Sequence, residues 1–324
     1  MPRAVIGHQF GPPESYALEE YDPGPPKPGE IRVAIKAAGV SFVDVLTARG
    51  EYQFKPPLPF IPGSEYAGVV EAVGEGVSGF VAGDRVFGTG LGGIFAEVSN
   101  FNARNVIKVP AAMSFEDAAV FPVNYVTAYY ALADRARAKL GESLLVLGAA
   151  GGTGFAAVEV GKHLGLRVIA SASSPDKQAA ARAGGADACV TTGAADWRDQ
   201  VKAANDGEPI DIVFDPVGGD ATELAFRTLG YDGRHLVIGF PAGIAALKTN
   251  LPLLKSASLI GVQMRDHALK RPADAEANRA KVMDLASQGL FHPAIARLYP
   301  LEDYAAAMNE AFSGRSPGRV VLSI

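Results

Sequence analysis

The pattern of apolar and polar positions separates two halves of the chain with different texture. In residues 1–110, short stretches such as 31–35 and 66–73 alternate apolar and polar side chains, and clusters of proline and glycine such as 23–29 separate them. Alternation with a period of two is typical of half-buried strands, and proline and glycine clusters are typical of turns. The pattern therefore predicts a mostly β N-terminal half.

From Ser114 onwards the pattern changes to alternating helices and strands. Ser114 and Asp117 have the spacing of a helix start, and alanine-rich helical spacing follows as far as Ala138. Each crossover between parallel strands needs a connection of helical length, so this alternation predicts a parallel sheet covered on both faces. The predicted strands are 144–147, 167–170, 188–191, 210–214, 235–238 and 259–264, and the predicted helices are 152–164, 175–183, 197–204 and 220–229.

The C-terminal tail predicts two helices, at 273–287 and 302–312, and a closing strand at 319–322. These elements are too few to form a domain with a core of its own. We therefore expect the tail to fold onto the N-terminal half. The predicted domains are residues 1–122 together with 266–324, and residues 123–265.

Composition and charge narrow the choice of partners. The chain has 324 residues, 48% of them hydrophobic, and a formal net charge of -5 without a block of basic residues. This balance argues against nucleic acid and against an anionic membrane surface, and no apolar run is long enough to span a bilayer. The single cysteine, Cys189, excludes a disulfide within the chain and a cysteine-based metal cage. We expect a cytoplasmic protein with small-molecule partners.

The most informative segment is the glycine-rich turn that follows the predicted strand 144–147. Two partial dinucleotide fingerprints fit it, Ala149-x-Gly151-x-x-Gly154 and Gly152-x-Gly154-x-x-Ala157. Glycines let a pyrophosphate approach the main chain, and the helix that follows offers free N–H groups and the positive end of its dipole. The turn predicts a dinucleotide site. The alternative is a turn that only lets the helix pack closely on the strand.

The end of the second predicted strand indicates which dinucleotide would bind. An NAD site has an acidic residue about 20 residues past the glycines to hold the ribose 2′-hydroxyl. Here the strand is followed by Ser173, Ser174 and Lys177, whose hydroxyls and ammonium suit a 2′-phosphate. NADPH is therefore the predicted cofactor. The alternative is an ordinary helix start in which Asp176 complements the helix dipole.

Several motifs in order along nearly the whole chain resemble one enzyme family. They are Gly-Val-Ser-Phe-Val-Asp at 39–44, Pro-Leu-Pro-Phe-Ile-Pro-Gly-Ser-Glu-Tyr-Ala-Gly at 57–68, Gly-Asp-Arg-Val at 83–86, Phe-Asp-Pro-Val-Gly-Gly at 214–219, Asn-Leu-Pro-Leu-Leu-Lys at 250–255 and Gly-Arg-Val-Val-Leu at 318–322. Together they resemble the zinc-free quinone oxidoreductase branch of the medium-chain dehydrogenase/reductase superfamily. The resemblance implies an α/β protein with a mostly β, GroES-like N-terminal domain and a doubly wound parallel-sheet (Rossmann) domain.

The resemblance also assigns cofactor residues and an assembly. It implies a pyrophosphate along the glycine turn, a 2′-phosphate at the end of the second strand, and a nicotinamide near residues from three other segments. It further implies a homodimer formed by pairing of the segment 259–264 between two copies. The residues implied for the pyrophosphate are Gly151, Gly152, Thr153 and Gly154, and those for the 2′-phosphate are Ser173, Ser174 and Lys177. Those implied for the nicotinamide end are Thr127, Phe240 and Met264.

Two substitutions within the motifs argue against a metal. Zinc-dependent relatives carry cysteine where this chain has Ser41 and histidine where it has Ser64. Hydroxyls are poor zinc ligands beside thiolate and imidazole, so Glu65 is expected to cap or pair within the core instead. Chemistry without a metal requires an acceptor that is already electrophilic. This favours an NADPH-dependent reductase of quinones or α,β-unsaturated carbonyls.

The resemblance places polar residues of two loops near the substrate, which makes Tyr52, Ser41 and Asp44 the candidate catalytic residues for stabilising or protonating the reduced product. Tyr52 as a packing aromatic and Asp44 as a helix-start acid are the structural alternatives. Two other functions stay open: a reductase of 2-enoyl thioesters, and a non-catalytic protein that binds NADPH.

Overall fold

The computed structural model describes residues 1–324, which form two compact units. Unit 1 comprises Met1–Val123 and Ile295–Ile324, and unit 2 comprises Asn124–Ala294. The C-terminal boundary differs from the sequence prediction, because residues 266–294 belong to unit 2 and only the last thirty or so residues return to unit 1. The segment 266–294 packs on residues of unit 2. The rings of His267 and Tyr130 stack with centroids 4.1 Å apart, and the Asn278 side chain donates a 2.6 Å hydrogen bond to the Asp134 carboxylate.

Unit 1 is built on a seven-stranded sheet. Its order is β14-β15-β3-β4-β5-β7, with β6 also paired to β3, and all pairs are antiparallel except β14 with β15. A separate antiparallel pair, β1 with β2, completes the strands. The strands are β1 (Arg3–Ile6), β2 (Ala17–Glu20), β3 (Glu30–Val40), β4 (Glu65–Val73), β5 (Arg85–Thr89), β6 (Val98–Asn102), β7 (Val106–Lys108), β14 (Ile295–Pro300) and β15 (Arg319–Ser323).

In β3 the alternating sequence pattern corresponds to alternating burial of the side chains. Ile31, Val33 and Ile35 are buried in the core of unit 1, while Arg32 and Ala34 between them are only partly buried.

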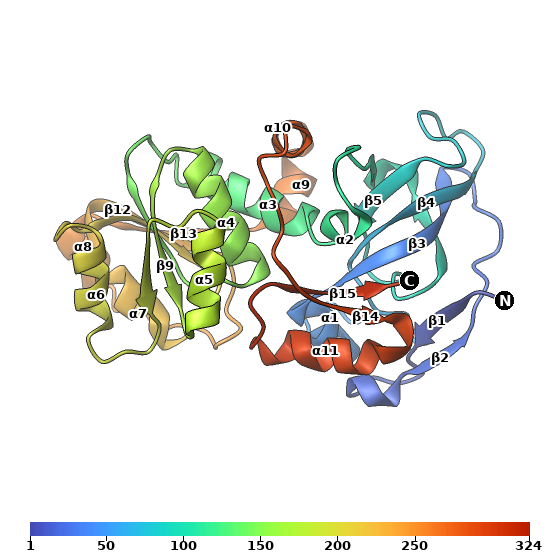
Figure 1. The fold of residues 1–324 in the computed structure, drawn as a ribbon, viewed down its shortest axis with the longest axis horizontal. Coiled ribbons are helices and arrows are strands. Elements are labelled where there is room, and N and C mark those ends of the chain that lie inside the picture. The colour runs from blue at the N-terminus through green and yellow to red at the C-terminus, as the bar shows by residue number, and fades with distance from the viewer. The chain divides into compact units, whose positions relative to one another are not determined.

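The helices of unit 1 are short, and Figure 1 shows α11 next to α1, which brings the two ends of the chain together within this unit. They are α1 (Phe42–Ala48), α2 (Phe115–Ala118) and α11 (Tyr304–Ser313), with single turns η1 (Pro13–Ser15), η2 (Ala103–Asn105) and η4 (Leu301–Asp303).

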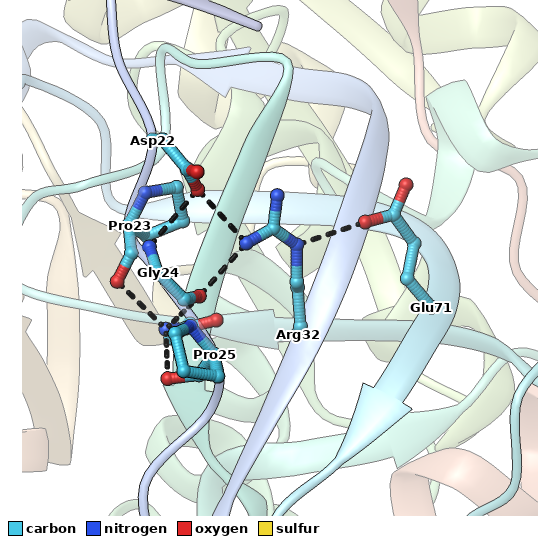
Figure 2. Close-up of polar contacts among 7 residues, drawn as sticks. Asp22, Pro23, Gly24, Pro25, Arg32 and Glu71 are labelled. Atoms are coloured by element: carbon cyan, nitrogen blue, oxygen red, sulfur yellow. Dashed lines mark hydrogen bonds and ion pairs between the residues drawn. The ribbon is translucent and has the colours of Figure 1, made fainter.

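The proline- and glycine-rich segment before β3 is fastened to the sheet by polar side chains (Figure 2). Arg32 donates to the carboxylate of Asp22 at 3.0 Å, to the carbonyl of Gly24 at 2.7 Å and to Glu71 on β4 at 3.0 Å. Asn100 on β6 donates to the carbonyls of the same segment. The turn therefore has a defined conformation although it lacks regular secondary structure.

Unit 2 contains the predicted parallel sheet, with six strands in the order β10-β9-β8-β11-β12-β13. Every neighbouring pair is parallel. Figure 1 shows α4 (Gly152–His163) and α5 (Pro175–Ala183) on one side of this sheet and α6 (Trp197–Ala204) and α8 (Asn250–Lys255) on the other, as the alternating sequence pattern predicts. The strands are β8 (Ser143–Val146), β9 (Arg167–Ala172), β10 (Ala188–Thr191), β11 (Ile210–Asp215), β12 (Leu229–Val237) and β13 (Ser258–Gly261).

The predicted helices 175–183 and 197–204 agree with the structure, and 152–164 agrees to within one residue. The predicted helix 220–229 is too long, because the helix ends at Phe226 and Leu229 begins β12. The last predicted strand is also wrong at its end. Met264 was expected to close a strand at 259–264, but β13 ends at Gly261 and Met264 begins a helix. The side chain of Gln263 caps that helix by accepting from the backbone N–H of Arg265. The helices are α3 (Pro122–Tyr129), the π-helical turn η3 (Tyr130–Arg135), α4 (Gly152–His163), α5 (Pro175–Ala183), α6 (Trp197–Ala204), α7 (Asp220–Phe226), α8 (Asn250–Lys255), α9 (Met264–Lys270) and α10 (Pro272–Ser287).

No helix of the structure combines the length and the apolar character that crossing a bilayer requires.

Candidate functional site

Most of the predicted cofactor residues lie at one edge of the sheet in unit 2. The glycine turn follows β8, Ser173 and Ser174 follow β9, Phe240 follows β12, and Met264 follows β13. Because all six strands are parallel, their carboxyl ends meet at the same edge. Open parallel sheets bind ligands at this edge, close to the position where the strand order reverses. In this sheet the order reverses between β8 and β11, because β9 and β10 lie on one side of β8 and the later strands lie on the other.

The glycine turn has the geometry of an open helix N-terminus. Gly148 has a φ of +57°, and its carbonyl accepts a 2.9 Å hydrogen bond from the N–H of Gly151, which is the N-cap of α4. No side chain caps this helix. The first N–H groups of a helix have no partner within it, so those of Gly152 and Thr153 are available to an anion.

Gly154 is the glycine that the fold itself requires. A Cβ atom at this position would lie 2.2 Å from the carbonyl oxygen of Gly148 and 2.9 Å from its carbonyl carbon. Both are backbone atoms, which cannot rotate away. A Cβ atom on Gly151 would instead lie 3.4 Å from the same oxygen, an ordinary contact. The two glycines therefore have different roles: Gly154 permits the close turn, and Gly151 leaves its outer side open.

Helix α3 is attached to this turn. Thr153 donates a 2.9 Å hydrogen bond to the side chain of Asn124, which is 3% exposed. Thr127, expected at the nicotinamide end, lies one turn further along α3 and is buried. Asn124 was not among the predicted residues, and no sequence motif marks it; the contact exists because α3 and α4 pack together.

The predicted 2′-phosphate residues lie together at the start of α5. Ser174 is the N-cap, and its side chain accepts from the backbone N–H of Lys177 at 3.4 Å. The Lys177 ammonium lies 3.5 Å from the Ser173 hydroxyl, and partial burial lowers the pKa of this lysine. Asp176 is exposed in the first turn of the same helix. The serine hydroxyls and the ammonium form a small cationic surface after β9.

Phe240 belongs to a loop that is held in place by the end of β11. The carboxylate of Asp215 accepts from the backbone N–H groups of Val217 and Gly218 at 2.9 and 2.8 Å, and Val217 in turn accepts from Ala242 at 2.9 Å. The Phe240 side chain is 51% exposed. An aromatic side chain left this open on an ordered loop is available for contact with a ligand.

In unit 1 the structure brings two of the three predicted catalytic residues into direct contact. Ser41 and Asp44 form a capping box at the start of α1: the Ser41 hydroxyl and N–H donate to the Asp44 carboxylate at 2.7 and 2.8 Å, and Asp44 N–H donates back at 3.2 Å. Burial raises the pKa of Asp44, and hydrogen bonds from Ser41 and Ser64 partly oppose this. The arrangement matches the helix-start alternative for Asp44.

Tyr52, the third candidate, lies in the turn after α1, where its N–H donates to the carbonyl of Leu46. Its side chain is half-buried, and no hydrogen bond joins its hydroxyl to Ser41 or Asp44. The hydroxyl is therefore not used by the fold, in contrast to the other two candidates.

Glu65 forms a buried ion pair with Arg319. The two side chains are 2% and 11% exposed, and the Arg319 guanidinium lies 3.0 Å from the Glu65 carboxylate. The second carboxylate oxygen accepts from the N–H of Val123 at 3.1 Å. Burial raises the pKa of Glu65, while Arg319 and the Val123 N–H lower it and Asp44 raises it further. The expectation that Glu65 pairs within the core is confirmed, and its partner is a residue of the closing motif whose role the sequence did not indicate.

No group of three or more His, Cys, Asp or Glu side chains is placed to hold a metal ion together. At the three positions discussed for zinc, Ser41 is engaged with Asp44, Ser64 donates to Asp44, and Glu65 is engaged with Arg319.

Comparisons with known proteins agree with this architecture. A family model described as "Alcohol dehydrogenase GroES-like domain" matches residues 27–111, and one described as "Zinc-binding dehydrogenase" matches residues 152–279. The first lies in the β-rich unit 1 and the second in unit 2 with its parallel sheet. These matches confirm the predicted fold class, a GroES-like N-terminal domain with a Rossmann domain.

Relatives of similar length resemble nearly the whole chain. The mouse protein "Quinone oxidoreductase-like protein 2" is 37% identical over 309 residues, covering 95% of this chain and 88% of its own. Human "Quinone oxidoreductase" is 32% identical over 323 residues, covering 99% and 97%. A crystal structure of Escherichia coli quinone oxidoreductase complexed with NADPH has a TM-score of 0.89 at 28% identity, covering 99% of this chain and 100% of that one. The chain therefore belongs to the quinone oxidoreductase branch of the medium-chain dehydrogenase/reductase superfamily.

Proposed function

We propose that the protein is an NADPH-dependent reductase that transfers hydride to a quinone or an α,β-unsaturated carbonyl compound without a metal. The observation that carries the proposal is the uncapped N-terminus of α4 beside a turn that tolerates no Cβ atom at Gly154. Membership of an oxidoreductase family, and the NADPH complex of the Escherichia coli relative, support a nicotinamide cofactor.

The residues present fit a dinucleotide. The open N–H groups at the start of α4, with Gly151 and Gly152 on the exposed side, would hold the pyrophosphate. Thr127, Phe240 and Met264 would lie toward the nicotinamide. Reduced nicotinamide supplies the hydride when it is bound, and the protein supplies binding, orientation and electrostatics.

Lys177, Ser173 and Ser174 support the choice of NADPH over NADH. They gather hydroxyl donors and a positive charge after β9, the strand whose end selects between the two cofactors. The acidic residue nearest to this strand end, Asp176, is exposed and lies within the first turn of α5. A phosphate dianion is favoured by this surface, whereas a carboxylate at the strand end would repel it.

We expect Lys177→Ala to weaken NADPH binding by about 10- to 100-fold, the worth of a hydrogen bond to a charged group. NADH lacks the 2′-phosphate, so its affinity should change little. Fluorescence titration with both nucleotides measures the ratio. Lys202→Ala, which removes an exposed lysine from α6 of the same unit, is the matched control for net charge. Equal losses for NADPH and NADH, or a wild-type preference for NADH, would contradict the assignment.

The engaged side chains in unit 1 support chemistry without a metal. Ser41, Ser64 and Glu65 already make hydrogen bonds or an ion pair inside the fold, and hydroxyls are weak ligands for zinc. An acceptor that needs no Lewis acid, such as a quinone or a conjugated enone, suits such a protein.

For the proton that follows hydride transfer we propose Tyr52. Its hydroxyl is not committed to the fold, whereas the Ser41 hydroxyl donates to Asp44, and Asp44 accepts from the backbone N–H of Ser41. Ser41 and Asp44 are better supported as the residues that hold the start of α1. A tyrosine hydroxyl can donate a hydrogen bond or a proton to a developing oxyanion.

The decisive experiment is NADPH consumption against a panel of quinones, enals, enones and 2-enoyl thioesters, with wild type and Tyr52→Phe in parallel. We expect turnover with quinones or enones, and a kcat reduced by about 100-fold in Tyr52→Phe, the lower range for general acid catalysis. Faster turnover of thioesters would favour an enoyl thioester reductase. Tight NADPH binding without oxidation by any acceptor would indicate a non-catalytic binding protein.

We further propose that two copies pair through β13 to form a homodimer, with small molecules and neither nucleic acid nor membrane as the other partners. β13 is the edge strand of the parallel sheet, paired only with β12, and its Leu259 is 48% exposed. An open apolar edge favours pairing with another strand. Sedimentation of a monomer at micromolar concentration would contradict the dimer.

A further inference from the structure

Glu159, on the helix that starts at the glycine turn, is a partly buried carboxylate that the proposed reaction does not use. It lies seven residues into α4, about 10 Å along the helix axis from Gly152. The Tyr125 hydroxyl of α3 donates a short hydrogen bond to it, and the backbone N–H of His292 donates to both of its oxygens at 3.2 Å. One side chain therefore connects three separate segments of unit 2.

Two of these segments are where the chain passes between the units. Asn124 is the first residue of unit 2, directly before Tyr125, and Ala294 is its last, two residues after His292. Aromatic packing reinforces the contact: Phe291 lies between Tyr125, with ring centroids 5.1 Å apart, and His163 at the end of α4, at 5.9 Å. Both connections are thus anchored to α4 at the same place.

We infer that Glu159 is a positioning residue, which fastens α3 and the segment around His292 to α4 and so fixes the spacing between the two ends of the dinucleotide site. The inference rests on the proposed function. Thr127, expected at the nicotinamide end, follows Tyr125 by two residues, while the pyrophosphate end is the first turn of α4. Together with the bond from Thr153 to Asn124, the contact from Tyr125 to Glu159 attaches α3 to α4 at a second point.

The strength of this attachment depends on the charge of the carboxylate. Burial raises the pKa of Glu159 to about 7, against the opposing effects of the Tyr125 hydroxyl and of the backbone and side chain of His292. The charged and titratable groups that face it are Tyr125 from α3 and His292 from the segment after α10, with His163 on α4 itself beyond Phe291. A hydrogen bond to a carboxylate is stronger than one to a carboxylic acid, so protonation loosens both contacts.

The test compares NADPH with 2′,5′-ADP, which carries the phosphates of the adenosine half and lacks the nicotinamide. For the wild type we expect the Kd of NADPH to rise about tenfold relative to that of 2′,5′-ADP as the pH falls from about 8 to about 6, a loss typical of a small misplacement. The midpoint should lie near the pKa of Glu159, about 7.

Two variants distinguish positioning from a merely structural contact. Glu159→Gln keeps an acceptor for Tyr125 and His292 but cannot ionise, so its affinity ratio should be independent of pH and equal to the low-pH value of the wild type. Tyr125→Phe removes the contact between α3 and Glu159 altogether, so its affinity ratio should stay close to the low-pH value of the wild type at both pH values. Asp199→Asn, at an exposed carboxylate on α6, should keep the wild-type profile.

A measurement on the wild type alone covers the case in which these variants fold poorly. The carboxyl carbon of Glu159, followed by NMR, should titrate near 7, and a value near 4.5 would overturn the inference. NADPH binding without a pH-dependent difference from 2′,5′-ADP would also overturn it and leave the proposed function intact. Failure of NADPH to bind at any pH would instead refute the proposed function, and the inference with it.

Discussion

Replacing Gly154 by alanine is expected to cost about 3 kcal/mol of stability and to lower the affinity for NADPH by at least about 100-fold. The added Cβ atom would lie 2.2 Å from the carbonyl oxygen of Gly148, so α4 must move away from the turn. That movement would disturb the hydrogen bond from the Gly151 N–H to the Gly148 carbonyl and displace the open N–H groups. Urea unfolding and NADPH titration measure the two effects.

Gly151→Ala is the matched control for this prediction. Its backbone has a φ of -81°, which alanine adopts without strain, and its Cβ atom would meet only an ordinary contact at 3.4 Å. We therefore expect its stability to stay close to that of the wild type, while its NADPH affinity falls because the new methyl group faces the anion. Wild-type stability and affinity in Gly154→Ala would show that the turn relaxes more easily than the geometry indicates.

Replacing Arg319 by methionine is expected to destabilise the protein by about 3–5 kcal/mol, the usual cost of removing one partner of a buried ion pair. Glu65 is 2% exposed and would lose the cation that lies 3.0 Å away. The Val123 N–H, which also donates to this carboxylate, cannot compensate the charge. The double variant Arg319→Met with Glu65→Leu should recover most of the loss, because it removes the uncompensated carboxylate.

The loss in Arg319→Met should depend on pH in a defined direction. Burial already raises the pKa of Glu65 above 4.5, and loss of Arg319 raises it further. Between the pKa of Glu65 in the unfolded chain and its higher pKa in the folded variant, the folded variant therefore binds more protons than the unfolded chain. Its stability therefore falls as the pH increases above about 4.5, and the deficit is larger near pH 8 than near pH 5. Urea unfolding at the two pH values measures this difference.

Arg227→Met provides the comparison at a more accessible ion pair. Arg227 directly follows α7, and its guanidinium lies 2.6 Å from the carboxylate of Glu223 on that helix, with side chains 35% and 26% exposed. Ion pairs that water can reach contribute less than about 1 kcal/mol, so this variant should remain close to the wild type. A loss of similar size in both variants would argue against burial as the cause.

Local patterns predicted most elements of the fold because those patterns act over short distances. The predicted helices 175–183 and 197–204 and the strand 188–191 match α5, α6 and β10 to the residue. The Ser114 helix start is also confirmed, since its side chain accepts from the N–H of Asp117 at 2.9 Å. The segment 259–264 was predicted incorrectly at its end: its apolar run continues past Gly261, but the side chain of Gln263 starts a helix there.

The partners of the buried polar residues could not be predicted in the same way. Ser41 and Asp44 lie three residues apart, so their capping box was within reach of sequence reasoning. Glu65 and Arg319 are 254 positions apart, and Glu159 and His292 are 133 apart. Such pairs form only where strands or helices from distant parts of the chain pack together, and nothing in either local sequence specifies the other member.

The sequence by itself determined the order of strands and helices, the parallel sheet of unit 2, the glycine turn and the family, because each depends on backbone preferences and motifs that lie within a few neighbouring residues. Only the tertiary structure decided that 266–294 belong to unit 2 and that Arg319 neutralises Glu65. These outcomes depend on burial: a charged or polar group removed from water must find a partner in space, and folding alone brings that partner near.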